Sequence, residues 1–220
     1  LMNQFHDILP GSSIRRVYED AARDYATIAE LAGSVLHGAL RQLEDRIDTS
    51  GFAQPVLVFN PSGHRRCEVT ELPDGRPALV DVPPCGYAVI ERDDPAHQET
   101  DSPVRVEKKA AGVVMENGLL RLCWDRKGHL VSCYDLEVGR EVLASGQVGN
   151  QLRLHPDFPN AYDAWDVDVF YHEAVEVVDG LTETRVVTQE ALRGEIRQVW
   201  KFGHSRLTQN IVLRAGSKRV

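Results

Sequence analysis

Residues 12–47 place apolar side chains at three- and four-residue steps, the spacing that one face of an α-helix produces. Pro10-Gly11 breaks the chain before this segment, and Ser12 or Ser13 is placed to cap a helix that follows. The pattern predicts one helix about 50 Å long. The apolar positions are Ile14, Val17, Tyr18, Ala21, Ala22, Tyr25, Ile28, Ala29, Ala32, Val35, Leu36, Ala39, Leu40, Leu43 and Ile47.

Such a helix needs partners, because an amphipathic helix is held by the packing of its apolar face rather than by intrinsic propensity. The sequence offers no second helical pattern of comparable length. We therefore expect the partner helices to come from another chain, or from a bundle whose other members lie outside these residues.

After Phe52 the apolar period changes from 3.6 to 2, which favours strands. The chain thus divides into four parts. Residues 1–51 hold the helix, 52–92 a small β unit, 93–103 a polar linker bounded by prolines, and 104–220 a second β region. Many short strands without intervening helices predict an antiparallel β-sandwich. The fold class is mainly β with an N-terminal helical segment. Strands are expected near 56–59, 67–71, 78–82, 86–91, 119–124, 130–134, 140–144, 150–155, 165–171, 174–179, 182–190, 193–203 and 206–214.

The formal net charge of -8 argues against nucleic acid and anionic membrane surfaces as partners. No apolar run approaches the roughly 18 residues that a membrane span requires. The four cysteines form no CxxC pair, so we interpret them as free thiols in a reducing, cytoplasmic compartment. The alternative is one disulfide between Cys123 and Cys133, which lie in neighbouring predicted strands. Secretion stays open, because the chain starts at Leu1 without an initiator Met.

His6-Asp7 is the first candidate site. Imidazole nitrogen and carboxylate oxygen both suit zinc, although the dipeptide alone is more typical of a surface or capping pair.

The surrounding string is more specific. Residues 1–14 (LMNQFHDILPGSSI) resemble the LLNQFHD-x-L/I-PGSSI signature of bacterial, fungal and plant-type α-mannosidases of glycoside hydrolase family 38. Asn60-Pro61 and Val82–Tyr87 resemble that family's first β unit. Gly139–Leu143 is similar to its "GRE-x-L" string, and Asp163–Asp168 to its "DAWDID" run. The chain thus resembles the family, bacterial type, along its whole length and in the same order.

The resemblance implies a retaining α-mannosidase with an N-terminal catalytic domain, a helical middle domain and C-terminal sandwiches of the galactose-mutarotase-like supersandwich type. It implies one zinc ion, with His6 as a ligand and Asp7 as a carboxylate that binds the sugar or orients the site. The nucleophile and the acid/base are expected upstream of Leu1, as are the other zinc ligands, and the sandwich is expected to continue beyond Val220. Since zinc needs three or four protein ligands, we expect residues 1–220 alone to bind no zinc and to lack glycosidase activity.

The Tyr162–Tyr171 run is the second candidate site. On a strand, Trp165 would share a face with Val167, Val169 and Tyr171. An aromatic face beside carboxylates could bind a sugar, which makes Trp165 a substrate-binding candidate. The alternative is a tryptophan packed in the core of the sandwich.

Three interpretations remain open from the sequence. The first is hydrolysis of terminal α-mannosides in oligosaccharides or glycoconjugates. The second is hydrolysis of another α-mannosyl conjugate, such as mannosylglycerate. The third is a non-catalytic carbohydrate-binding or assembly module. Association into a homo-oligomer is compatible with all three.

Overall fold

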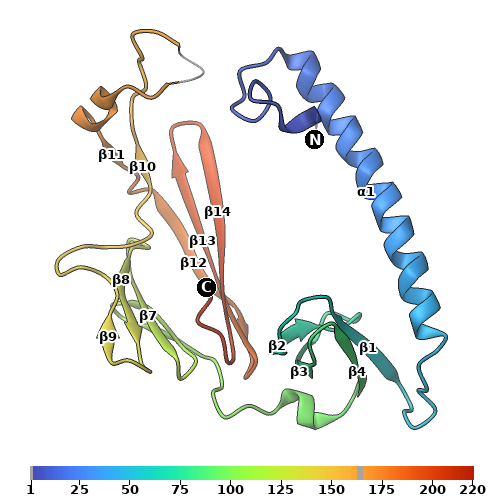
Figure 1. Ribbon diagram of the computed structural model, residues 1–220. Coiled ribbons are helices and arrows are strands. Elements are labelled where there is room, and N and C mark those ends of the chain that lie inside the picture. Colours follow the sequence, from blue (N-terminus) through green and yellow to red (C-terminus); the bar gives the residue numbers. More distant parts are fainter. Residues whose placement is uncertain (1, 163–165) are drawn as a thin grey trace. The chain divides into compact units, whose positions relative to one another are not determined.

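The computed structural model describes residues 2–162 and 166–220 and is mainly β, as predicted (Figure 1). The chain forms two compact units. One holds the residues up to Asp48 together with Leu154–Glu176, and the other holds Thr49–Arg153 and Val177–Val220. No helix in the described part of the chain is long and apolar enough to cross a membrane.

The N-terminal helix, α1, runs from Arg15 to Glu44, within the predicted range of 12–47, and is preceded by a 3-10 turn, η1, at Met2–Gln4. Figure 1 shows it as one continuous helix. Ala21 is its one buried residue, and several large apolar side chains are exposed on it: Tyr25, Ile28, Leu31, Val35, Leu36 and Leu43. The predicted amphipathic stripe is therefore present, with its apolar side chains exposed to solvent.

The predicted serine cap of this helix is wrong. Ile14 occupies the N-cap position and its side chain makes no capping hydrogen bond. The hydroxyls of Ser12 and Ser13 instead donate to the backbone carbonyl of Asp7. The turn before the helix thus competes with the helix terminus for the same side chains.

The small β unit consists of four strands, close to their predicted positions. β1 (Pro55–Asn60) pairs antiparallel with β4 (Gly86–Glu91), and β2 (Arg66–Glu71) pairs antiparallel with β3 (Pro77–Val82). Its core is formed by Leu72, Ala78, Val80, Val82 and Ile90.

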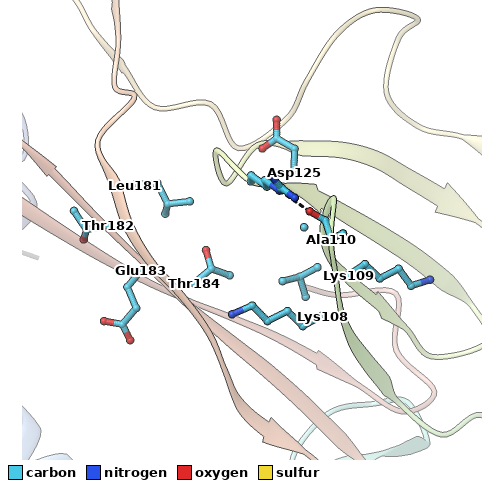
Figure 2. A pocket seen from close by; sticks show the side chains of 11 residues that line it. Lys108, Lys109, Ala110, Asp125, Leu181, Thr182, Glu183 and Thr184 are labelled. Carbon is cyan, nitrogen blue, oxygen red and sulfur yellow. Dashed lines mark hydrogen bonds between the residues drawn. The ribbon is translucent and has the colours of Figure 1, made fainter.

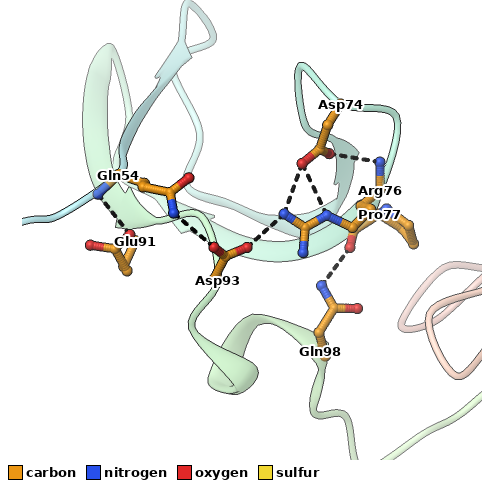
Figure 3. Close-up of polar contacts among 7 residues, drawn as sticks. All are labelled: Gln54, Asp74, Arg76, Pro77, Glu91, Asp93 and Gln98. Atoms are coloured by element: carbon orange, nitrogen blue, oxygen red, sulfur yellow. Dashed lines mark hydrogen bonds and ion pairs between the residues drawn. The ribbon is translucent and has the colours of Figure 1, made fainter.

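The segment predicted to be a linker, 93–103, is attached to this unit (Figure 3). It contains a short 3-10 helix, η2 (Pro95–Gln98), capped by the Asp94 side chain. The Gln98 amide donates to the Pro77 carbonyl at 2.7 Å, and Arg76 pairs with Asp93 at 2.8 Å. The polar residues that suggested a linker therefore serve as hydrogen-bonding groups that hold the segment against β3.

Two antiparallel sheets build the sandwich. The first has the order β5-β6-β7-β8-β9, and the second has the order β12-β13-β14. Their buried side chains form one core cluster that includes Met115, Leu122, Trp124, Ile196 and Leu213. The strands are β5 (Arg105–Lys109), β6 (Gly112–Glu116), β7 (Leu120–Asp125), β8 (Leu130–Asp135), β9 (Arg140–Glu141), β12 (Leu181–Gln189), β13 (Arg193–Phe202) and β14 (Ser205–Arg214).

The stretch between β9 and β12 departs most from the prediction. Among the residues that the structure describes there, the strands are two residues long, β10 (Arg153–Leu154) and β11 (Glu176–Val177), and Val169–Glu173 form a 3-10 helix, η3. The strand predicted at 165–171 is therefore wrong over Val169–Tyr171, where the Tyr171 N–H donates to the Asp168 carbonyl instead of to a neighbouring strand. Val167, Val169 and Phe170 are exposed. The alternation of apolar and polar residues in this segment therefore does not mark a buried face.

All four cysteines are free thiols, as the sequence predicted, and the alternative of a disulfide between Cys123 and Cys133 is wrong. Cys123 lies opposite Ser132, whereas Cys133 lies opposite Leu122 of the core. Because side chains alternate between the faces of a sheet, the two sulfurs lie on opposite faces and cannot bond.

The domain limits 1–51, 52–92, 93–103 and 104–220 stay predictions.

Candidate functional site

His6 and Asp7 lie in the turn-rich segment before α1, and their side chains face the solvent. The His6 side chain is 66% exposed and the Asp7 side chain 42% exposed, and the Nε2 atom of His6 lies 3.6 Å from the Oδ1 atom of Asp7. The rings of Phe5 and His6 are in contact, with centroids 4.1 Å apart. The structure thus presents an imidazole and a carboxylate side by side at an accessible position.

The backbone under this pair is held firmly, in contrast to the exposed side chains. The carbonyl oxygen of Asp7 accepts hydrogen bonds from the hydroxyls of Ser13 at 2.8 Å, Tyr18 at 3.3 Å and Ser12 at 3.4 Å. The Tyr18 hydroxyl also accepts the Ser13 N–H at 2.8 Å. We call this set of contacts the Asp7 clamp.

Gly11 completes the turn, because its φ of +86° lies in the region that residues with a side chain rarely adopt. The PGSS string is therefore explained by the shape of the loop. The part played by Ser13 and Tyr18 was missed at the sequence level, where both were assigned to the helix alone. The adjacency of two serines after a Pro-Gly turn is the one sequence feature that could have suggested it.

The donor types in this loop fit zinc, but their number does not complete a site. His6 and Asp7 offer one nitrogen and one carboxylate, whereas protein zinc sites have three or four protein ligands. Within residues 2–162 and 166–220, no group of three or more His, Cys, Asp or Glu side chains is arranged to hold a metal ion. The described residues supply part of such a site at most.

Trp165, the substrate-binding candidate, lies outside the described residues. The flanking residues form a hollow of about 260 Å³ whose lining includes Phe158, Phe170 and Tyr171 together with the carboxylates Asp157 and Asp168. Phe158 is 87% exposed. The Asp168 carboxylate accepts the Asn160 N–H at 2.7 Å, which ties the two sides of this segment together. Aromatic side chains and carboxylates thus lie together here, although not by the strand alternation that was expected.

A larger hollow, about 390 Å³, lies between β5–β6 and β12 (Figure 2). Lys108, Lys109 and Arg126 contribute positive charge, and Thr182 and Thr184 contribute hydroxyls. Several of its polar groups already have partners: Arg126 donates to the Ala110 carbonyl, and Asp125 accepts the N–H groups of Lys127 and His129. Among the described residues that line it, none is an aromatic side chain on which a sugar could stack.

Two other strings that resembled the family, those of Asn60 and Glu141, have structural functions. Asn60 is buried, and its side-chain amide donates to the carbonyls of His64 at 2.7 Å and Pro83 at 2.9 Å while its oxygen accepts from Ser62. Asn60 therefore links the turn after β1 to the loop between β3 and β4.

Glu141 of the GRE-x-L string acts similarly at β8 and β9. Its carboxylate accepts hydrogen bonds from the Ser132 hydroxyl at 2.7 Å and from the N–H groups of Cys133 and Leu143 at 2.8 and 3.0 Å. These hydrogen bonds lower the pKa of the Glu141 carboxyl below its usual value. Both strings mark turns.

Comparison with known proteins relates the chain to two domains of one family. Residues 1–43 match the alpha mannosidase middle domain, and residues 115–220 match the glycosyl hydrolases family 38 C-terminal domain.

Alpha-mannosidase 2C1 of Homo sapiens is 35% identical over 234 residues, and that of Mus musculus is 36% identical over 238 residues. Each alignment covers all of this chain and 22% of the relative. Alpha-mannosidase G of Dictyostelium discoideum is 23% identical over 275 residues, covering the whole chain and 25% of the relative. The chain thus spans less than a third of the length of these relatives. The two domain matches, at residues 1–43 and 115–220, relate the chain to glycosyl hydrolases family 38.

Proposed function

We propose that these residues are part of a retaining, zinc-dependent α-mannosidase that removes terminal α-linked mannose from oligosaccharides or glycoconjugates. The observation that carries the proposal is the His6–Asp7 pair, exposed on a clamped loop inside the segment that matches the middle domain. The names of the relatives, which are alpha-mannosidases, support the same reaction class.

In this proposal His6 donates one nitrogen to zinc, and Asp7 binds sugar hydroxyls or orients the site. Zinc, when bound, supplies Lewis acidity toward sugar oxygens. The remaining ligands, the nucleophile and the acid/base belong to regions of the longer protein outside residues 1–220. We accordingly expect purified residues 1–220 to hydrolyse no aryl α-mannoside and to hold no stoichiometric zinc. A clear zinc signal in metal analysis of that fragment would contradict this assignment.

The test is His6→Ala in the full-length protein, with His37→Ala as the matched control. His37 is an exposed residue of α1 that lies in none of the motifs above. We expect wild type and His37→Ala to hydrolyse an aryl α-mannoside and to contain zinc. We expect His6→Ala to lose bound zinc and at least about 100-fold in kcat/KM, because removing a ligand should cost no less than removing a residue that only orients one, which costs about 10–100-fold. Undiminished zinc content and activity in His6→Ala would refute the role of His6.

The same assay separates the alternatives. NMR of the first product anomer reports retention or inversion. Activity on mannosylglycerate but not on oligomannosides or aryl α-mannosides would favour the second substrate class. Binding of mannosides by the full-length protein without hydrolysis would favour a non-catalytic module. Trp165→Ala should raise KM for oligomannosides if that residue contacts substrate. The bacterial subtype, a cytoplasmic location and a homo-oligomer remain part of this proposal.

A further inference from the structure

The Asp7 clamp connects the candidate site to the first turn of α1. Tyr18 lies on that turn, and its hydroxyl both accepts from the Ser13 N–H at 2.8 Å and donates to the Asp7 carbonyl at 3.3 Å. The Ser13 hydroxyl reaches the same carbonyl oxygen at 2.8 Å. Ser13 and Tyr18 therefore hold each other as well as the backbone that carries the candidate ligands.

The use of these hydroxyls is informative because both serines lie where a helix cap is normally found. A serine at the N-cap ordinarily stabilises the start of a helix by bonding to a free N–H. Here the N-cap is Ile14, which makes no such bond, while the serine hydroxyls point back to Asp7. The hydroxyls thus stabilise the conformation of the loop instead of the end of the helix.

The clamp restricts the backbone and leaves the side chains accessible. Rotation of the peptide that follows Asp7 would break the hydrogen bonds to its carbonyl oxygen, whereas the side chains of His6 and Asp7 are 66% and 42% exposed. A fixed backbone with exposed side chains is expected where side chains bind a metal or a substrate. The residues that contact the metal or substrate need a supporting set of hydrogen bonds to fix their orientation.

We propose that Ser13 and Tyr18 are positioning residues of the His6–Asp7 site, acting through the Asp7 carbonyl to set the direction in which His6 and Asp7 leave the backbone. The inference rests on the proposed function for its kinetic consequence, but the clamp itself can be tested without it.

The experiment uses the full-length protein with Tyr18→Phe and Ser13→Ala, each of which removes one hydroxyl. Tyr25→Phe is the matched control, because Tyr25 is a second, half-exposed tyrosine of the same helix that takes no part in the clamp. Ser13→Thr is the rescue variant, since it keeps a hydroxyl at that position. The measurements are amide hydrogen exchange of residues 5–13, the melting temperature, zinc content and the kinetics of aryl α-mannoside hydrolysis.

We expect Tyr18→Phe and Ser13→Ala to speed exchange in residues 5–13 and to lower kcat/KM by about tenfold or more, since Ser13→Ala removes one hydrogen bond and Tyr18→Phe removes two. The melting temperature should shift by less than about 2 °C, because the loop is exposed and buries little apolar surface. Ser13→Thr should recover most of the loss, and Tyr25→Phe should behave like wild type.

A purely structural role predicts a different result, namely a lowered melting temperature with unchanged kinetics per folded molecule, and that result would overturn the inference. Unchanged exchange in both hydroxyl variants would overturn it as well. If wild type hydrolyses no mannoside at all, the proposed function fails, while faster exchange in residues 5–13 still decides whether the clamp exists.

Discussion

Glu141 illustrates how a single side chain can hold a turn in this protein. Its exposed carboxylate accepts hydrogen bonds from a hydroxyl and from two backbone N–H groups around the β8–β9 connection. Asn60 does the same at a buried position with an amide instead of a carboxylate. The difference matters because the carboxylate can be protonated, so its contribution to stability depends on pH.

At this scale we predict a pH-dependent effect of Glu141→Gln. The hydrogen bonds hold the pKa of Glu141 below its unfolded value, which is about 4.3 for a free glutamate. The stabilisation is therefore complete above that value and is lost as the pH falls through the lower pKa of the folded state. Urea unfolding between pH 7 and pH 3 should show wild type more stable than the variant at pH 7, with the difference shrinking below about pH 4.

Glu176→Gln, at an exposed carboxylate of the two-residue strand β11, serves as the control. A difference between wild type and Glu141→Gln that stays constant down to pH 3 would show that the carboxylate charge is not what stabilises the turn.

At the scale of elements, strand register decides what neighbouring residues can do. β7 and β8 pair so that Cys123 faces away from the core and Cys133 faces toward it. Burial raises the pKa of both thiols, which lowers their thiolate fraction at neutral pH. Cys67 and Cys85 are exposed instead.

We therefore predict two classes of cysteine reactivity. In native protein at pH 8, an alkylating reagent should label Cys67 and Cys85 quickly and Cys123 and Cys133 slowly, because the thiolate is the reacting form. Peptide-level mass spectrometry measures each rate and shows whether unfolding equalises them. A peptide that joins Cys123 to Cys133 under non-reducing conditions would contradict the observed register.

At the scale of the whole molecule, the unit formed by Thr49–Arg153 and Val177–Val220 holds the small β strands together with the sandwich. Val69 of β2 is buried in the same cluster as the sandwich residues Val106, Ile196 and Leu213. Arg193 of β13 adds a polar connection, since it pairs with Glu71 and with Glu195, each at 2.7 Å. The two β regions that the sequence separates are thus packed together.

We predict that Val69→Ala destabilises both regions together. Loss of the two methyl groups should cost roughly 1–3 kcal/mol, and hydrogen exchange should accelerate in β13 as well as in β2. Val131→Ala is the control, because Val131 on β8 is 43% exposed and should change stability by less than about 0.5 kcal/mol. Faster exchange confined to β2 and β3 would show that the small β unit unfolds independently of the sandwich.

Local periodicity and local turn residues were enough to predict several features of this protein. The stripe of α1, the strands of the small β unit and the three long strands β12–β14 follow from the spacing of apolar residues, and the signature around His6-Asp7 indicated the family.

Other features depend on partners distant in the sequence or on competition for a single group, so they required the folded structure. Ser12 and Ser13 could cap a helix or close a loop, and the Asp7 carbonyl together with the Tyr18 hydroxyl settled the choice in favour of the loop. Residues 169–171 alternated like a strand, but a strand requires a neighbour, and the local hydrogen bond to Asp168 formed a 3-10 turn instead. Cys123 and Cys133 are close in sequence, yet the pairing of β7 with β8 put their sulfurs on opposite faces because side chains alternate across a sheet.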